Sequence, residues 1–434
     1  MRVRRLPFPV LSRFRYSNTL AGAGAACLAF LSAGCVPREE GVVRLRVSFW
    51  SPPGLEERVA REFEASHPGV KIDLLITGGR YAEKIQSMIV ASNEPDVMMV
   101  HDTFYHDWAA RNVFGDVTPL VHELDTEDPF MPMPLMTLRS DGGFDAVPFS
   151  TTAMATFGNL ELLAAAGVAF PWTSMTWEEI EALAPQFSRY GGNPDSPTSY
   201  LCALPQEPYF LVAFGARAFD DLHHPTRVVV DSPQTLEAIK YWRRMHQRGW
   251  AVPRSTVLDR GESELFRDGH VALLFEARAS VRILMGNPDL KWDVAPVPAP
   301  ATGDGKVPSI TVGLAISRRT KHADLAREYI RFYLSDEAMA IPLAAGHVVP
   351  TRRGQVARWL QQPMAESAET FVRPLESGIS AVAYSPGRLE VETLIRRRFE
   401  QSLAEPDLPA EHIVAGLAAD LQAWLERMQE KGLL

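Results

Sequence analysis

Residues 46–76, RVSFWSPPGLEERVAREFEASHPGVKIDLLI, decide how the N-terminal part of this chain folds. A short apolar strand ends in Trp50-Ser51, and a Pro-Pro-Gly turn follows. The next residues place three apolar side chains on one helix face at a spacing of four: Leu55, Val59 and Phe63. His67-Pro68-Gly69 ends this helix, and the alternation of apolar residues over 70–74 predicts a second strand. The stretch therefore predicts a strand–helix–strand unit that presents an aromatic ring and a hydroxyl at the end of its first strand.

The start of the chain has the features of an export signal. Residues 1–16 contain five arginines and no acid, residues 20–31 are apolar or small, and the run closes in Leu31-Ser32-Ala33-Gly34-Cys35. A basic segment, a short apolar core and small residues before a cleavage point are typical of a signal peptide. The run is shorter than the roughly 20 apolar residues that span a bilayer. A plain secretory signal with an incidental cysteine is the alternative.

Strand and helix patterns alternate from Arg44 to about Val147, which predicts a parallel sheet. Residues 95–100, PDVMMV, read as a buried strand that delivers His101 and Asp102 to its carboxyl end. Open α/β sheets place their ligands at this end of the strands. We therefore expect these two side chains at a binding site.

The second half of the chain carries signals for helix boundaries. Thr176-Trp177-Glu178-Glu179 predicts a capping box, and Ser232-Pro233 predicts the cap and first turn of another helix. The aromatic stretch Glu207-Pro208-Tyr209-Phe210 is interpreted as a loop. Glu262, Glu264 and Asp268 are interpreted as a solvated helix face. Four apolar residues in register predict a helical C-terminus: Ile413, Leu417, Leu421 and Leu425.

Composition narrows the function classes. Without the five arginines of residues 1–34, the net charge of −9 becomes −14, which excludes a general electrostatic attraction to nucleic acid or anionic lipid. Of the three cysteines, Cys27 and Cys35 belong to the N-terminal signal region, so Cys202 has no partner for a disulfide or a CxxC site. Roughly 400 remaining residues are enough for two hydrophobic cores, because single cores stop growing at about 250–300 residues.

Several motifs extend the pattern of residues 46–76 along the chain. They are AVPFSTT at 146–152, TWEE at 176–179, FRDGHVAL at 266–273, WDVAPVP at 292–298 and GHVVPTR at 346–352. In these motifs, and in their order, the chain resembles the extracellular solute-binding proteins of ABC importers, in the carbohydrate-binding group that includes maltose-binding protein. The family's Tyr-Tyr-Asn-Lys element is Thr156-Phe157-Gly158-Asn159 here, which weakens one aromatic contact. Cys35 after Ala33-Gly34 resembles a lipobox, although Ser32 stands where a leucine is usual.

The resemblance implies an α/β, two-lobed, periplasmic-binding-protein-like fold with hinge-connected lobes and a helical C-terminus. It implies a lipoprotein signal peptide at 1–34, a tether at 35–43, lobe one at 44–148 and 309–350, and lobe two at 149–308 and 351–434. The protein would be exported and lipid-anchored through Cys35 to the periplasmic or extracellular face of the bacterial cell membrane. It would act as a monomer without catalysis or cofactor, capture a carbohydrate, and deliver it to membrane permease subunits.

A sugar site needs aromatic plates for the C–H faces and carboxylates, arginines or hydroxyls for the ligand hydroxyls. At the family's positions, residues of these types occur in both lobes and in the segments that cross between the lobes. They are Trp50, Ser51, Tyr81, His101, Asp102, Phe149, Ser150, Thr151, Glu207, Tyr209, Phe210, Glu276, Arg278, Gly313 and Arg352.

Other interpretations stay open. His101-Asp102 and His106-Asp107 could hold zinc, but no third ligand with recognisable spacing follows. Arg278 and Arg352 suit a sugar phosphate such as glycerol phosphate, because guanidinium groups match phosphate oxygens. An exported glycoside hydrolase needs two carboxylates at a fixed separation, and the sequence permits such a pair. A surface adhesin or chaperone with the same two-lobed body is the third class.

Overall fold

The strand–helix–strand unit predicted from residues 46–76 is present in the computed structural model. The structure describes residues 41–51, 54–140, 142–187, 199–301, 305–346, 348–362, 366–376 and 381–434. Strand β1 (Val43–Phe49) pairs in parallel with β2 (Val70–Ile76), and helix α1 (Leu55–Ser66) connects them. The predicted helix face is confirmed, because its three side chains are buried: Leu55, Val59 and Phe63.

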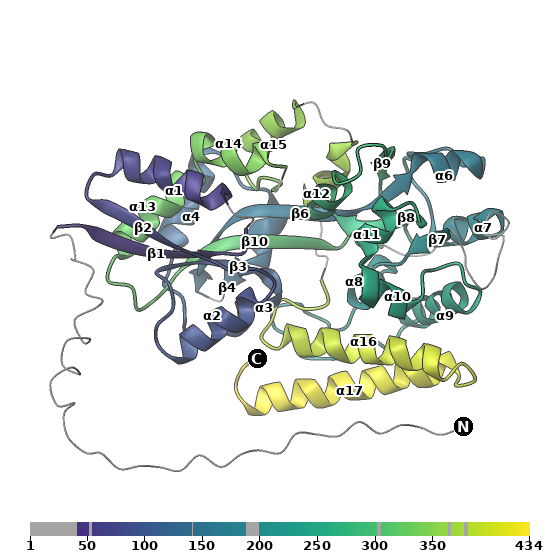
Figure 1. The fold of residues 1–434 in the computed structure, drawn as a ribbon. Coiled ribbons are helices and arrows are strands. Elements are labelled where there is room, and N and C mark those ends of the chain that lie inside the picture. The colour runs from purple at the N-terminus through teal and green to yellow at the C-terminus, as the bar shows by residue number, and fades with distance from the viewer. Residues whose placement is uncertain are drawn as a thin grey trace, which may run out of the picture. The chain divides into compact units, whose positions relative to one another are not determined.

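One mixed sheet runs through the residues from Val43 to Leu434. Its hydrogen-bonded order is β2-β1-β3-β10-β6-β8-β7, and β9 pairs with the second part of β6 on the edge opposite β8. Figure 1 shows β6 and β10 crossing the centre, with β1–β3 on one side and β7–β9 on the other. The remaining strands of this sheet are β3 (Val97–His101), β6 (Ala146–Asn159), β7 (Tyr200–Ala203), β8 (Val271–Ala277), β9 (Trp292–Ala295) and β10 (Ser309–Ile316). Strands β4 (Arg139–Ser140) and β5 (Gly143–Phe144) form a separate pair.

Strand β6 joins the two halves of the sheet. Its first part pairs antiparallel with β10, which also pairs with β3, and its second part pairs with β8 and β9. Val312 lies opposite Ser150 while Gly313 lies opposite Pro148, so Phe149 is an extra residue on β6, a β-bulge. The segment around Val349 runs beside the bulge and accepts the Thr151 N–H at 3.0 Å.

Two large hydrophobic cores lie on the two halves of the sheet. The first packs β1–β3 and β10 against the surrounding helices and contains Phe49, Phe63 and Tyr329. Besides α1, its helices are α2 (Tyr81–Val90), α3 (Asp102–Ala109), α4 (Thr118–Glu127), α13 (Ala323–Tyr333) and α14 (Asp336–Ala344). The second contains Trp177 and Phe210 together with side chains of the C-terminal helices. The predicted α/β, two-lobed class with two cores is therefore confirmed.

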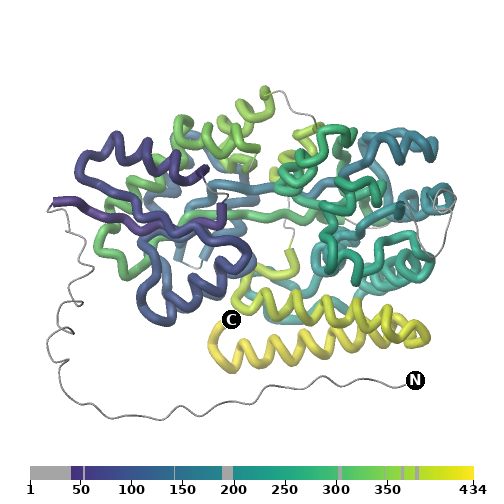
Figure 2. The backbone as a smooth tube through the Cα atoms, in the orientation of Figure 1, coloured from purple at the N-terminus to yellow at the C-terminus, as the bar shows by residue number. Residues whose placement is uncertain are grey.

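The second half of the molecule is rich in helices. They are α6 (Leu160–Ala165), α7 (Trp177–Phe187), α8 (Glu207–Ala213), α9 (Pro233–Gln247), α10 (Arg254–Arg260), α11 (Glu262–Arg267), η1 (Arg278–Ser280) and α12 (Val281–Leu284). Smaller elements accompany the segments between the halves: α5 (Pro132–Thr137), α15 (Arg353–Leu360), η2 (Ala368–Phe371) and η3 (Arg373–Glu376). Helices α16 (Arg388–Ala404) and α17 (Ala410–Glu430) lie side by side, as Figures 1 and 2 show.

The boundary predictions have mixed outcomes. The capping box is confirmed, because Glu179 accepts the Thr176 N–H at 2.7 Å and Thr176 accepts the Glu179 N–H at 3.2 Å. Ser232 caps α9 as predicted. The interpretation of residues 207–210 as a loop is wrong, since Pro208 occupies the first turn of α8 and supplies the helical φ there. The helical C-terminus is confirmed, with all four residues of the predicted register buried in α17.

Across the described part of the chain, none of the helices combines the length and apolar character that a membrane span needs. Residues 1–40, which include the predicted signal and Cys35, lie outside the described residues.

Candidate functional site

A cavity of about 180 Å³ lies where the two halves of the sheet meet. Its walls come from the end of β1, the first turn of α1, the bulged part of β6, β10, η1 and the segment around Val349. Seven of the fifteen predicted site residues line it: Trp50, Ser51, His101, Phe149, Ser150, Thr151 and Arg278. Apolar side chains cover much of the remaining wall, among them Leu55, Ile310, Val312, Val348 and Val349. An apolar cavity with a few polar groups is the usual form of a small-molecule site.

Trp50 follows directly on β1 and keeps part of its surface exposed. Its ring meets the Tyr81 ring edge-on, with centroids 4.9 Å apart and planes at 68°. The Tyr81 hydroxyl lies 2.8 Å from the Ser48 hydroxyl and donates to the Met99 carbonyl at 2.8 Å. Tyr81 is therefore buried behind Trp50 and supports it, rather than lining the cavity.

Glu56 is a cavity residue that sequence reasoning missed. Ser51 donates to its Oε1 at 2.6 Å, and the Tyr333 hydroxyl donates to the same oxygen at 3.2 Å. Burial raises the pKa of Glu56 to about 7, even though both hydrogen bonds favour the ionised form. The helix pattern hides this residue, because Glu56 belongs to the charged side of α1 by spacing alone. Nothing local in the sequence indicates that Tyr333, which is 277 residues away, would cover it.

Asp102 lies beside the cavity without lining it. It is fully buried, with Oδ1 2.9 Å from His101 Nδ1 and Oδ2 3.4 Å from Arg388 Nη1. Its Oδ2 also accepts the Thr311 N–H at 3.4 Å. Burial acts to raise the pKa of Asp102, but the charges of Arg388 and His101 outweigh it and lower the pKa to about 2. Asp102 therefore stays ionised and holds His101 and α16 in place.

None of the candidates predicted on α8 and β8 lines the cavity. Glu207 is buried 3.4 Å from Arg254 Nε and 3.7 Å from Arg396 Nε, and Phe210 belongs to the second core. Tyr209 is half-buried on the same helix. Glu276 accepts the Ala277 N–H at 2.9 Å. Burial is the main cause that raises the pKa of Glu276, and repulsion from Glu262 raises it further.

The interpretation of Glu262 as part of a solvated face is wrong. Only 14% of its side chain is exposed, and its Oε1 lies 3.4 Å from Arg254 Nη1. Burial raises the pKa of Glu262, and Glu276 lies beside it. Because Glu262 and Glu276 share this buried position, one of them holds a proton more readily than a solvated acid does.

Arg278 lines the cavity but is engaged by the protein. Its Nε and Nη2 donate to Glu366 Oε1 at 2.9 and 2.7 Å, and its Nη1 donates to the Gly346 carbonyl at 2.9 Å. The guanidinium carbon also lies 5.0 Å from the centroid of the Trp359 ring. These contacts fix the direction of the side chain and balance its charge within the fold.

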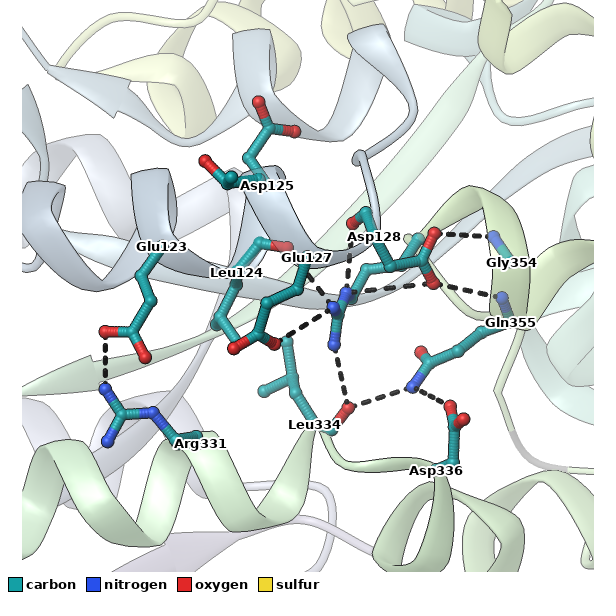
Figure 3. A network of polar contacts seen from close by, with 12 residues as sticks. Glu123, Leu124, Asp125, Glu127, Asp128, Arg331, Leu334, Asp336, Gly354 and Gln355 are labelled. Atoms are coloured by element: carbon teal, nitrogen blue, oxygen red, sulfur yellow. Dashed lines mark hydrogen bonds and ion pairs between the residues drawn. The ribbon is translucent and has the colours of Figure 1, made fainter.

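Arg352 and Gly313 contact other parts of the protein and not the cavity. Arg352 donates to three backbone carbonyls, and Figure 3 shows these partners converging with Glu127 on one guanidinium: Leu124, Asp128 and Leu334. The guanidinium thereby joins α4 to the segment that precedes α14. A Cβ on Gly313 would lie 2.5 Å from Leu138 Cδ1, so β10 packs closely there. Neither residue lines the cavity.

The metal interpretation has no support among the described residues. They contain no group of three or more His, Cys, Asp or Glu side chains that could hold an ion. His106 Nε2 lies 3.0 Å from the Thr137 carbonyl, and burial is the main cause that lowers its pKa to about 3. Cys202 is buried with a free thiol.

Two cores on one sheet, with a cavity where the halves meet, define a ligand-binding protein of the two-lobed periplasmic class. The family model for bacterial extracellular solute-binding proteins matches residues 50–340, and the chain belongs to this family.

Known relatives agree with this family. A predicted binding protein of Brucella abortus (strain 2308) is 24% identical over 316 residues, which are 71% of this chain and 75% of the relative. An ABC substrate-binding protein of Listeria monocytogenes in complex with cycloalternan has a TM-score of 0.77 at 19% identity, covering 89% of this chain and 99% of that one. UgpB of Mycobacterium tuberculosis in complex with glycerophosphocholine has a TM-score of 0.75 at 18% identity, covering 89% and 100%.

Proposed function

We propose that this chain is the substrate-binding lipoprotein of an ABC import system and that it captures a carbohydrate for delivery to a membrane permease. The observation that carries the proposal is the cavity between the two halves of the sheet, with Trp50 partly exposed on its wall. An aromatic face suits the C–H face of a sugar ring, and Ser51, Ser150 and Thr152 bring hydroxyls to the same wall. The protein binds and releases its ligand without turnover, as a monomer without a cofactor.

Movement of the two lobes is part of the proposal. The lobes are 44–148 with 309–350, and 149–308 with 351–434, and they rotate about β6, β10 and the segment near Pro350. Because both lobes supply walls of the cavity, the ligand stabilises the form in which both sets of contacts are made. X-ray scattering with and without saturating ligand tests this, and identical curves would contradict closure.

Anchoring completes the proposed arrangement. Lipidation of Cys35 holds the exported protein at the cell membrane, close to the permease. Metabolic labelling with a radioactive fatty acid, compared between the wild type and Cys35→Ala, measures lipid attachment. Equal incorporation into both proteins would contradict the assignment of Cys35.

A ligand screen tests the carbohydrate proposal directly. Residues 36–434 would be melted with mono-, di- and oligosaccharides, sugar alcohols and glycerol phosphates. A ligand at 100 times its Kd stabilises the folded state by about 2.7 kcal/mol, which a thermal shift detects. A shift with uncharged sugars is the expected result, and its absence across all sugars would refute the proposal. Product analysis after long incubation tests the enzyme alternative, since cleavage of an oligosaccharide would show turnover.

A sugar phosphate is the second candidate. The similarity to a glycerophosphocholine complex favours it. Against it, both arginines expected to receive a phosphate have partners within the protein. A thermal shift with glycerol phosphates alone would favour this candidate.

A further inference from the structure

Glu56 occupies an unusual position for a carboxylate. Only 1% of its surface is exposed, and it lines the cavity together with its two hydrogen-bond donors, Ser51 and Tyr333. Both donors use Oε1, while Oε2 is buried without a hydrogen-bond partner. A buried oxygen of this kind is costly for the folded protein unless a donor reaches it. Glu56 therefore has unused capacity to accept a hydrogen bond.

The charges around the cavity leave Glu56 uncompensated. Arg278 is paired with Glu366, and the other charged pair beside the cavity joins Asp102 to Arg388. Among the residues that the structure describes, no basic side chain forms an ion pair with Glu56 within 4.0 Å. When Glu56 is ionised, the unbalanced charge on the cavity wall is negative.

We propose that Glu56 sets the charge selectivity of the cavity: its carboxylate accepts a hydrogen bond from a hydroxyl of an uncharged sugar, and it excludes ligands that carry a phosphate. This inference rests on the proposed function and narrows its ligand class. A sugar hydroxyl supplies the missing donor to the carboxylate, and hydrogen bonds to charged groups are the stronger ones. A fully ionised phosphate group supplies no donor. It also brings further negative charge into a cavity whose arginine is already paired.

The protonation of Glu56 makes the selectivity depend on pH. The titratable groups near its carboxylate are Glu57 on α1 and the phenols Tyr329 and Tyr333 on α13. His101 and Arg278 contribute to the same cavity wall. The raised pKa of Glu56, about 7, means that the ionised acceptor forms between pH 6 and 8. Binding of an uncharged sugar should therefore tighten as the pH rises through this range, and exclusion of phosphate should strengthen with it.

Calorimetry on residues 36–434 at pH 6 and pH 8 tests the inference. The uncharged probes are glucose, maltose and glycerol, and the anionic probe is glycerol 3-phosphate, which pairs with glycerol. In the wild type we expect uncharged sugar to bind about 3- to 10-fold more tightly at pH 8 than at pH 6. Glu56→Gln should weaken sugar binding at pH 8 by about 10- to 100-fold, remove its pH dependence, and improve binding of glycerol 3-phosphate.

Glu62→Gln is the matched control, because it removes the same charge from an exposed position on α1. It should leave both affinities unchanged. Tighter binding of glycerol 3-phosphate than of every uncharged probe by the wild type at pH 8 would overturn the inference, and this comparison needs no variant. Sugar binding that is equal in the wild type and Glu56→Gln at both pH values would also overturn it. If no uncharged sugar of the ligand screen binds at either pH, the proposed function itself fails.

Discussion

Replacing Arg278 by Met should strongly destabilise the protein. Arg278 holds Glu366 through two hydrogen bonds of 2.9 and 2.7 Å, and only 3% of the Glu366 side chain is exposed. Without Arg278, a buried carboxylate loses its counter-charge, which typically costs about 3–5 kcal/mol. Loss of the guanidinium from the Trp359 ring adds roughly 0.5–2 kcal/mol. Arg278→Met should therefore reduce the free energy of unfolding by at least about 3 kcal/mol.

Urea unfolding of a double-mutant cycle measures this cost. The cycle contains Arg278→Met, Glu366→Gln and the double variant, with tryptophan fluorescence as the signal. The double variant should be less destabilised than the sum of the single variants, because no buried charge is left alone. Arg353→Met is the control, since it breaks an exposed pair with Glu376 and should cost at most about 1 kcal/mol. Additive single effects, or a cost for Arg278→Met equal to that of Arg353→Met, would refute the reasoning.

Four further predictions concern separate features. Because burial raises the pKa of Glu56 from 4.5 to about 7, the ligand-free protein should lose up to about 3 kcal/mol of stability between pH 4.5 and 7 from this group. Glu56→Gln should flatten that part of the melting profile, and an unchanged slope would contradict the assignment. Trp50→Ala should weaken sugar binding by about 1–3 kcal/mol in calorimetry, and unchanged affinity would remove Trp50 from the site. Thr176→Ala removes a cap and should cost about 1 kcal/mol in urea unfolding, whereas a neutral result would mean that the cap contributes nothing. Gly158→Ala should cost about 1–3 kcal/mol, because the added Cβ would lie 2.6 Å from the Phe170 ring; unchanged stability would show that the ring moves freely.

The elements of the fold were predictable because periodic patterns and caps act over a few residues. The faces of α1 and α17, the strand that ends at His101 and the cap at Thr176 all depend on spacing that can be read locally. The prediction of a loop at residues 207–210 was wrong, because it gave more weight to their aromatic content than to Pro208. A proline at this position is suited to a first helical turn.

The chemistry of the site was less predictable, because it depends on partners far apart in the chain. Arg278 suits a phosphate by residue type, yet Glu366 stands 88 positions further on and occupies its guanidinium. In the sequence Glu56 resembles the other acids of its helix, and only the folded structure shows that Tyr333 covers it. Spacing predicts which face of an element is buried, but it does not show which side chain from another element meets that face.

The bulge at Phe149 makes the length of the connecting strand as important as its composition. Phe149 is the residue of β6 without a partner on β10, so its deletion would leave the pairings of Pro148 and Ser150 unchanged. Deleting a paired residue instead would exchange the two faces of β6 on one side of the deletion, because side chains alternate along a strand. If the deletion preceded Ser150, Ser150 and Thr152 would turn away from the wall that they share with Trp50, and core residues would turn towards it. A one-residue deletion at a paired position should therefore abolish folding of one half of the molecule, whereas deletion of Phe149 keeps the phase of the alternation.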